Sequence, residues 1–209
     1  MKTLIAAVFS TALMAAQPTL TVTVTPQIAY PGTTVTATTT FTDTAQATGV
    51  AGLQFTEAIQ FAGGAVGPTG LSLIQIAGPA ANTAGKSITC NTTSGMCLEV
   101  GVNTGTFSNG VVAVGTFVVP KQATAGPYSI ALSNTLGANL AGSAVPITAG
   151  PSASFTVGTF DLNGDGATDV LDLQLLINQI LTGTAKDISG DGITNIVDAQ
   201  VMANALRLP

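Results

Sequence analysis

The chain has 209 residues and carries very little charge, with five Lys and Arg, ten Asp and Glu, and neither His nor Trp. The missing His excludes imidazole metal ligands and every nucleophile pair that needs a His base. Five cations are too few for the basic surface that binds nucleic acid, so no nucleic-acid partner is expected. Seven of the acids lie after residue 158, where Lys186 and Arg207 are the only cations, so residues 159–209 carry the whole net charge of −5. This asymmetry points to a local role for the acids.

The N-terminus has the pattern of an export signal. Lys2 is followed by an apolar run, Thr3 to Ala16, that only Thr and Ser interrupt and that small residues close. This predicts a signal peptide over residues 1–16 and a secreted or cell-surface protein, with a retained apolar strand or helix as the alternative. The run is shorter than the roughly 20 residues of a membrane span, so no transmembrane span is expected in the mature chain.

Residues 19–158 have the pattern of a β domain. Leu20–Thr25 alternates apolar side chains with Thr, Thr34–Phe41 does the same, and helical periodicity is nearly absent. Further strands are expected at Val50–Phe61, Leu71–Ile76, Ser87–Cys90, Cys97–Val102, Val111–Val119, Tyr128–Leu132, Pro146–Thr148 and Ser152–Val157. About eight to ten short strands between turn residues predict a mainly β protein with an antiparallel β-sandwich or jelly roll.

Two pairs of residues in this domain are candidates for chemistry. Cys90 and Cys97 bracket a turn-rich stretch, and in an oxidising compartment a disulfide is expected between them. A redox or metal pair is the alternative, although the spacing is not CxxC-like and no further ligands accompany it. Glu57 and Glu99 could face one cleft as a glycosidase pair. With no Trp and two Tyr to stack on a sugar, we interpret them as surface charges or strand-end ion pairs, and expect no enzyme activity.

The acidic segment is an internal duplication. Residues 161–180 read DLNGDGATDVLDLQLLINQI and residues 187–206 read DISGDGITNIVDAQVMANAL, with eight identical positions. Each copy starts with an acidic loop, D-x-[N/S]-x-D-G-x-x-[D/N]-x-x-D, and continues with apolar residues at helical spacing. The expected apolar helix faces are Leu173, Leu176, Ile177 and Ile180, and then Val201, Met202 and Ala205.

Both loops have the ligand spacing of EF-hand calcium loops. Ca²⁺ takes about six to eight oxygens, supplied from loop positions 1, 3, 5, 7, 9 and 12, with Gly at position 6. The ligands predicted for the first loop are Asp161, Asn163, Asp165, the Ala167 carbonyl, Asp169 and Asp172. Those for the second loop are Asp187, Ser189, Asp191, the Ile193 carbonyl, Asn195 and Asp198. We therefore expect two bound Ca²⁺, the second held more weakly because its loop has fewer carboxylates; a pair of solvated acidic turns is the alternative.

The loops also depart from the EF-hand pattern. Both end in Asp rather than Glu, and no clear helix leads into the first loop. In these features the duplicated loop-helix of residues 161–206 resembles the dockerin family, which implies two bound Ca²⁺ and a cohesin module as partner. In dockerins, loop positions 10 and 11 help to select the cohesin. They are apolar here, so an apolar partner contact or the core of the small module is expected at Val170, Leu171, Ile196 and Val197.

The β domain resembles the cohesins more loosely, in the strand patterns of residues 31–35, 50–55 and 110–117. The expected organisation is a signal peptide over 1–16, a cohesin-like β-sandwich over 19–158 and a dockerin-like module over 159–209. Both modules on one chain predict a secreted, non-enzymatic, calcium-dependent assembly or adhesion protein. Its partner is a cohesin-like domain, and if that domain belongs to the next copy, the product is a head-to-tail filament or a ring. The alternative is a scaffold, adaptor or carbohydrate-binding protein that docks on a different cohesin-bearing partner, with polysaccharide as a further ligand.

Overall fold

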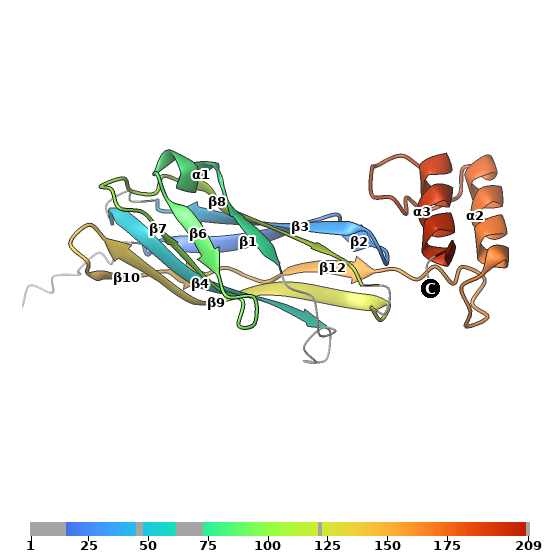
Figure 1. The fold of residues 1–209 in the computed structure, drawn as a ribbon, viewed down its shortest axis with the longest axis horizontal. Coiled ribbons are helices and arrows are strands. Elements are labelled where there is room, and N and C mark those ends of the chain that lie inside the picture. The colour runs from blue at the N-terminus through green and yellow to red at the C-terminus, as the bar shows by residue number, and fades with distance from the viewer. Residues whose placement is uncertain (1–15, 45–47, 62–72, 121–122, 208–209) are drawn as a thin grey trace, which may run out of the picture.

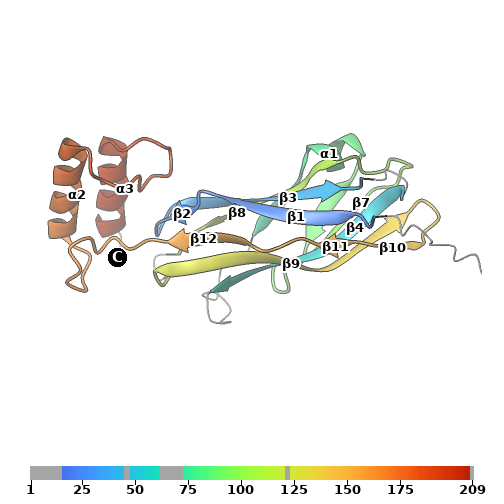
Figure 2. The same ribbon diagram turned by 180° about the vertical axis from the view of Figure 1, so that it is seen from behind.

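The computed structural model describes residues 16–44, 48–61, 73–120 and 123–207. The signal peptide predicted over 1–16 therefore lies outside the described residues, except for Ala16. Figure 1 shows an elongated β-sandwich followed by a pair of helices, which lie beyond one end of the sandwich. Figure 2, from the opposite side, shows that strands β2 and β12 point toward this end.

The β domain consists of two sheets packed face to face. The first has the order β11-β1-β3-β8-β5, formed by Thr148–Ala149, Thr19–Thr25, Thr34–Thr42, Gly110–Val118 and Ile74–Ala77. The second has the order β2-β12-β9-β4-β7-β6, formed by Ile28–Ala29, Ala153–Val157, Gly126–Asn139, Val50–Phe61, Met96–Val100 and Ser87–Cys90. β10 (Ala144–Pro146) pairs with β9, and a short helix, α1 (Pro79–Thr83), lies between β5 and β6 in the chain.

The alternation in the sequence decides which face of each strand is buried. In β1 every second side chain is apolar and lies in the core between the sheets: Leu20, Val22 and Val24. On the outer face the register of β1 with β3 puts Thr opposite Thr, from the pair Thr19 and Thr42 to the pair Thr25 and Thr36. Threonine methyl and hydroxyl groups therefore cover a surface that charged side chains cover in most domains.

The predicted β-sandwich is confirmed, with differences in detail. β4 and β6 have the predicted bounds, and β9 is longer than predicted because it continues through a register shift beside Asn134, whose φ is 50°. The sheets are antiparallel apart from two short parallel pairs, β1·β11 and β2·β12, each of two residues. β2 and α1 were not predicted, because two and five residues are too few to show a periodicity.

Two helices and their preceding loops make up the C-terminal module. α2 covers Val170–Thr182 and ends at Gly183, whose φ of 71° is in the left-handed region that glycine adopts without steric cost. α3 covers Ile196–Arg207. Leu176 and Met202 are completely buried, and the other predicted apolar positions pack around them: Leu173, Ile177, Ile180, Val201 and Ala205. No helix within the described ranges is both long and apolar enough to cross a membrane.

Candidate functional site

The first acid of each loop organises the turn that follows it. The two carboxylate oxygens of Asp161 accept hydrogen bonds from the N–H groups of Gly164 at 2.7 Å and Gly166 at 2.9 Å. Asp187 accepts the equivalent pair in the second loop, from glycine N–H groups at 2.7 and 2.8 Å. Gly166 at loop position 6 has a φ of 90°, which a residue with a Cβ adopts only with strain. The two loops therefore share one backbone conformation.

The last acid of each loop is buried beneath it. Asp172 is inaccessible to solvent and accepts the N–H groups of Leu162 at 2.7 Å, Asn163 at 3.1 Å and Asp169 at 2.9 Å. The N–H of Asp169 does most to lower the pKa of Asp172 below its usual range, against the opposite effect of burial. The side chain of Asp172 is therefore an ionised carboxylate that holds the two ends of the loop together.

Asp198 occupies the same place in the second loop. Burial raises its pKa, but three N–H groups, from Asn195, Ser189 and Ile188, outweigh burial, so the pKa lies below its usual range. The three nitrogens lie 2.7–2.8 Å from its oxygens.

The acid or amide at loop position 9 starts the helix. Asp169 is the N-cap of α2 and accepts the N–H of Leu171 at 2.7 Å, while the N–H of Asp169 is bonded to Asp172 in a capping box. Asn195 accepts the N–H of Val197 at 2.7 Å in the second loop. Loop positions 10 and 11 therefore fall in the first turn of each helix.

The chemistry of the donors fits Ca²⁺. Every predicted side-chain ligand is an oxygen donor, and several are carboxylates, which is the set that a hard cation prefers. In the described residues these carboxylates are bonded to backbone amides, and no group of three or more His, Cys, Asp and Glu side chains is gathered closely enough to hold a metal. The ligand set therefore remains a prediction. On binding, Ca²⁺ would draw these carboxylate oxygens together, and its bonds to them would replace some of their hydrogen bonds to backbone amides.

The sequence of the C-terminal module matches a known family. Residues 159–207 fit the family model described as the dockerin type I domain. The C-terminal module therefore matches the dockerin family. The match covers less than half of the chain, and no curated protein matches the sequence.

The β-sandwich is similar to solved cohesin structures. A non-cellulosomal cohesin from the archaeon Archaeoglobus fulgidus has 11% identity and a TM-score of 0.50, over 70% of this chain and 94% of that chain. The sixth cohesin of scaffoldin B from Acetivibrio cellulolyticus, solved with a dockerin, has 15% identity and a TM-score of 0.51, over 68% and 100%. A cohesin module of a family 33 glycoside hydrolase from Clostridium perfringens has 9% identity and a TM-score of 0.52, over 68% and 97%. At these identities the likeness shows the fold, so the sandwich is cohesin-like, and the dockerin module supports a protein-interaction role in cohesin docking.

The dockerin module exposes its apolar residues at loop positions 10 and 11. Val170, Leu171, Ile196 and Val197 are 68%, 59%, 72% and 45% exposed. The alternative in which these side chains form the core of the small module was therefore wrong. The core uses the opposite helix faces, around Leu176 and Met202, and leaves these four side chains available for a partner.

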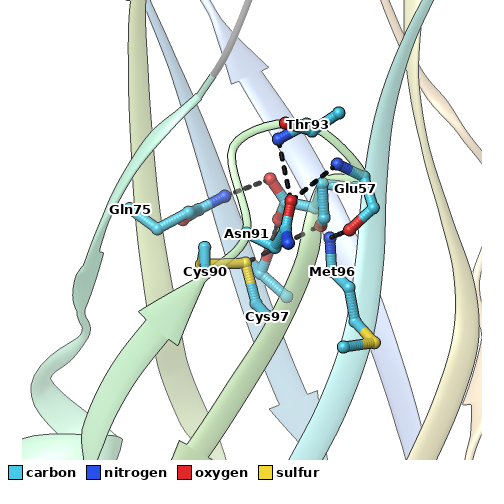
Figure 3. Close-up of a disulfide and its surroundings, with 10 residues drawn as sticks. Glu57, Gln75, Cys90, Asn91, Thr93, Met96 and Cys97 are labelled. Carbon is cyan, nitrogen blue, oxygen red and sulfur yellow. Dashed lines mark hydrogen bonds between the residues drawn. A yellow bond between two sulfur atoms is a disulfide. The ribbon is translucent and has the colours of Figure 1, made fainter.

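A cavity lies beside the predicted disulfide, which is confirmed. The bond between Cys90 and Cys97 closes a turn in which Asn91 accepts the N–H groups of Thr93 at 2.9 Å and Ser94 at 3.0 Å (Figure 3). This turn, Glu57 and Gln75 line a cavity of 210 Å³. Figure 3 shows the Gln75 amide donating to the Glu57 carboxylate next to the turn. Thr39 also donates to Glu57, so the carboxylate is held inside the sandwich.

The interpretation of Glu57 and Glu99 as surface charges was wrong. Glu57 is 6% exposed and Glu99 is completely buried, although both belong to strands whose outer faces are open. Glu57 lies on the inward face of β4 with Leu53, Phe55 and Ile59, and this alternation was the signal in the sequence that could have placed it. Glu57 lines the cavity beside the disulfide turn, whereas the completely buried Glu99 is not among the residues that line it.

Proposed function

We propose that this chain is a secreted, calcium-dependent assembly or adhesion protein whose dockerin module docks on a cohesin-like domain. The observation that carries the proposal is the set of four apolar side chains at loop positions 10 and 11, which are exposed at the start of both helices. Apolar side chains placed outside a small core usually mark a contact with another surface. The near repeat of the module gives two similar faces of this kind.

The partner that we propose first is the cohesin-like sandwich of another copy. β7 offers an acceptor, because its outward side chains Met96, Leu98 and Val100 are all apolar and between 43% and 46% exposed. They lie beside the outer face of β4, whose Gln54 and Thr56 add hydrogen-bonding groups. A contact between two different surfaces of identical chains is heterologous, so repetition produces a filament or a closed ring.

Calcium is the structural ion of this proposal. It would be held by the predicted ligands of the first loop, from Asp161 to Asp172, and of the second, from Asp187 to Asp198. When bound, the ion neutralises the carboxylates and stabilises the loop from which the exposed positions 10 and 11 project. Extracellular modules bind Ca²⁺ at roughly 10⁻⁴–10⁻³ M, a range that suits an exported protein.

Analytical ultracentrifugation of the chain with Ca²⁺ and with EGTA tests self-assembly. We expect oligomers whose size grows with protein concentration in Ca²⁺ and a monomer in EGTA. A monomer in both conditions, at the highest concentration reached, would refute docking between copies. Calcium-dependent capture of a separate cohesin by the immobilised chain, with no self-association, would instead support the scaffold or adaptor role.

A further inference from the structure

Tyr30 belongs to the β domain in sequence and to the dockerin module in packing. It follows β2 directly, and its side chain is 2% exposed. Its ring lies 5.5 Å from that of Phe160 at an interplanar angle of 20°, a stacked pair. The apolar cluster that contains Tyr30 is completed by residues of the C-terminal module: Phe160, Leu176, Ile188, Ala199 and Met202. The sandwich therefore supplies one side chain to the core of the module that follows it.

The surroundings of Tyr30 hold its ring in one position. The hydroxyl of Thr33 accepts the N–H of Tyr30 at 3.0 Å and donates to its carbonyl at 2.8 Å. The N–H of Gly158, in the connection between the modules, donates to the carbonyl of Ala29 at 2.7 Å. A Cβ on Gly158 would come within 2.5 Å of the Tyr30 ring, so the connection passes directly against the aromatic face. This junction is packed rather than a flexible tether.

The second loop lies closer to the sandwich than the first. Ile188, at loop position 2, is 1% exposed in the Tyr30 cluster, and its N–H holds Asp198. A Cβ on Gly190, at loop position 4, would lie 3.3 Å from Pro26 of the sandwich, whereas one on Gly164, the equivalent of Gly190 in the first loop, would meet nothing within 4 Å.

We infer that the end of the sandwich, centred on Tyr30, is a platform that holds the second loop in its calcium-binding conformation. This inference rests on the proposed calcium sites. Three carboxylates and neutral side chains make the second site the weaker one. Packing of Ile188 against Tyr30 stabilises the ordered loop, which lowers the net cost of ordering it when the ion binds. The sandwich thereby raises the affinity of the second site and fixes the direction in which the dockerin module projects.

Tyrosine fluorescence tests the contact without altering it. The chain has two Tyr and no Trp, so Tyr128→Phe leaves Tyr30 as the only strong emitter. We expect its emission to change on Ca²⁺ addition and to saturate together with the weaker site measured by calorimetry. Calcium binding by calorimetry with unchanged Tyr30 emission would overturn the inference.

Calorimetry on full-length variants tests the energetic coupling. Removal of the ring by Tyr30→Ala should weaken the second site about tenfold, and the first site less, because it removes an aromatic pair and the packing beneath Ile188. Tyr30→Phe keeps the ring and should change either affinity by no more than about twofold.

Tyr128 provides a matched control. It is also 2% exposed and stacks at 5.5 Å on Phe155, but inside the sandwich core. Tyr128→Ala should lower the stability of the sandwich and leave the calcium affinity of the second site unchanged.

Equal calcium affinities in Tyr30→Ala and wild type would refute the platform but not the proposed calcium sites. A loss of affinity confined to the first site would refute the platform in the same way. A wild-type chain that binds no Ca²⁺ would refute the proposed calcium sites themselves. If Tyr30→Ala does not fold, the fluorescence titration of Tyr128→Phe still decides the matter.

Discussion

Glu99 is a buried acid without a hydrogen-bond partner among the described residues. Its side chain is inaccessible to solvent, and within the described part of the chain neither carboxyl oxygen is hydrogen-bonded. Burial, with a smaller effect from the charge of Glu57, raises the pKa of Glu99 from 4.5 to about 8. The folded protein therefore keeps a proton that the unfolded chain releases. The stabilising effect of this proton is complete below pH 4.5 and is lost as the pH rises toward 8.

We expect Glu99→Gln, which cannot ionise, to be less sensitive to alkaline pH than the wild type. The variant should be more stable at pH 8 by up to about 4 kcal/mol, and should lie within about 1 kcal/mol of the wild type at pH 5. Urea unfolding at both pH values in saturating Ca²⁺ measures the difference. A stability difference between the two proteins that does not vary with pH would contradict the raised pKa.

At the scale of elements, the disulfide secures the turn between β6 and β7. Cys90 and Cys97 are seven residues apart and are paired directly across the two strands. Replacement of both by Ala should lower the free energy of unfolding by about 2–3 kcal/mol, because the unfolded chain regains the entropy of an open loop. Urea unfolding measures this loss. Wild type treated with reductant serves as the control and should show a similar shift, and no shift in either case would contradict the structural role of the bond.

The calcium loops and their helices should respond as one unit. Without Ca²⁺ the carboxylates within each loop repel one another, and the small core around Leu176 and Met202 is expected to be insufficient alone. Chelation should therefore reduce the helical signal in circular dichroism and leave the β signal unchanged, and added Ca²⁺ should restore the helices. Asp187→Asn should remove the weaker of two calorimetric binding events, whereas Asp161→Asn should remove the stronger. A helical signal that is indifferent to chelator would contradict this.

The elements differ in how far the sequence predicts them. The loops and helices are predictable because their determinants lie within a few residues of one another, as in the Asp169 and Asp172 capping box. The burial of Glu57 was predictable in principle from its place in the alternation of β4. The role of Tyr30 was not predictable, because it depends on packing against residues of the C-terminal module that lie more than a hundred positions further along the chain. β2 was missed because its pairing with β12 is made by residues distant in sequence.

At the scale of the whole molecule, the packed junction and the exposed helix starts have separate consequences. The platform at Tyr30 uses the side of the dockerin module that faces the sandwich, as Figure 1 shows for the position of the helices beyond β2 and β12. The four side chains at loop positions 10 and 11 are exposed and remain free to contact a second molecule. A fixed direction of projection would make every contact in a chain of copies alike, as a regular filament requires.

Substitution of these four side chains by Ser should abolish assembly without removing calcium. None is a predicted ligand, whereas each apolar side chain that becomes fully buried contributes about 1.5–3 kcal/mol. The pair Val170→Ser and Leu171→Ser, or the pair Ile196→Ser and Val197→Ser, should weaken association at least about tenfold if that face alone is used. The fourfold variant, which combines both pairs of substitutions, should weaken association whichever face is used.

Leu181→Ser is the matched control, because Leu181 is 80% exposed in the last turn of α2, at the opposite end of that helix from Val170 and Leu171. It should leave assembly unchanged. Sedimentation in Ca²⁺ distinguishes these outcomes, with calorimetry to verify that all variants still bind the ion. If the fourfold variant assembles as well as wild type, loop positions 10 and 11 do not form the docking surface. An equal loss of association in the two double variants would show that both faces are engaged at once. Each dockerin module would then join two partners, and the product would branch rather than form a simple filament.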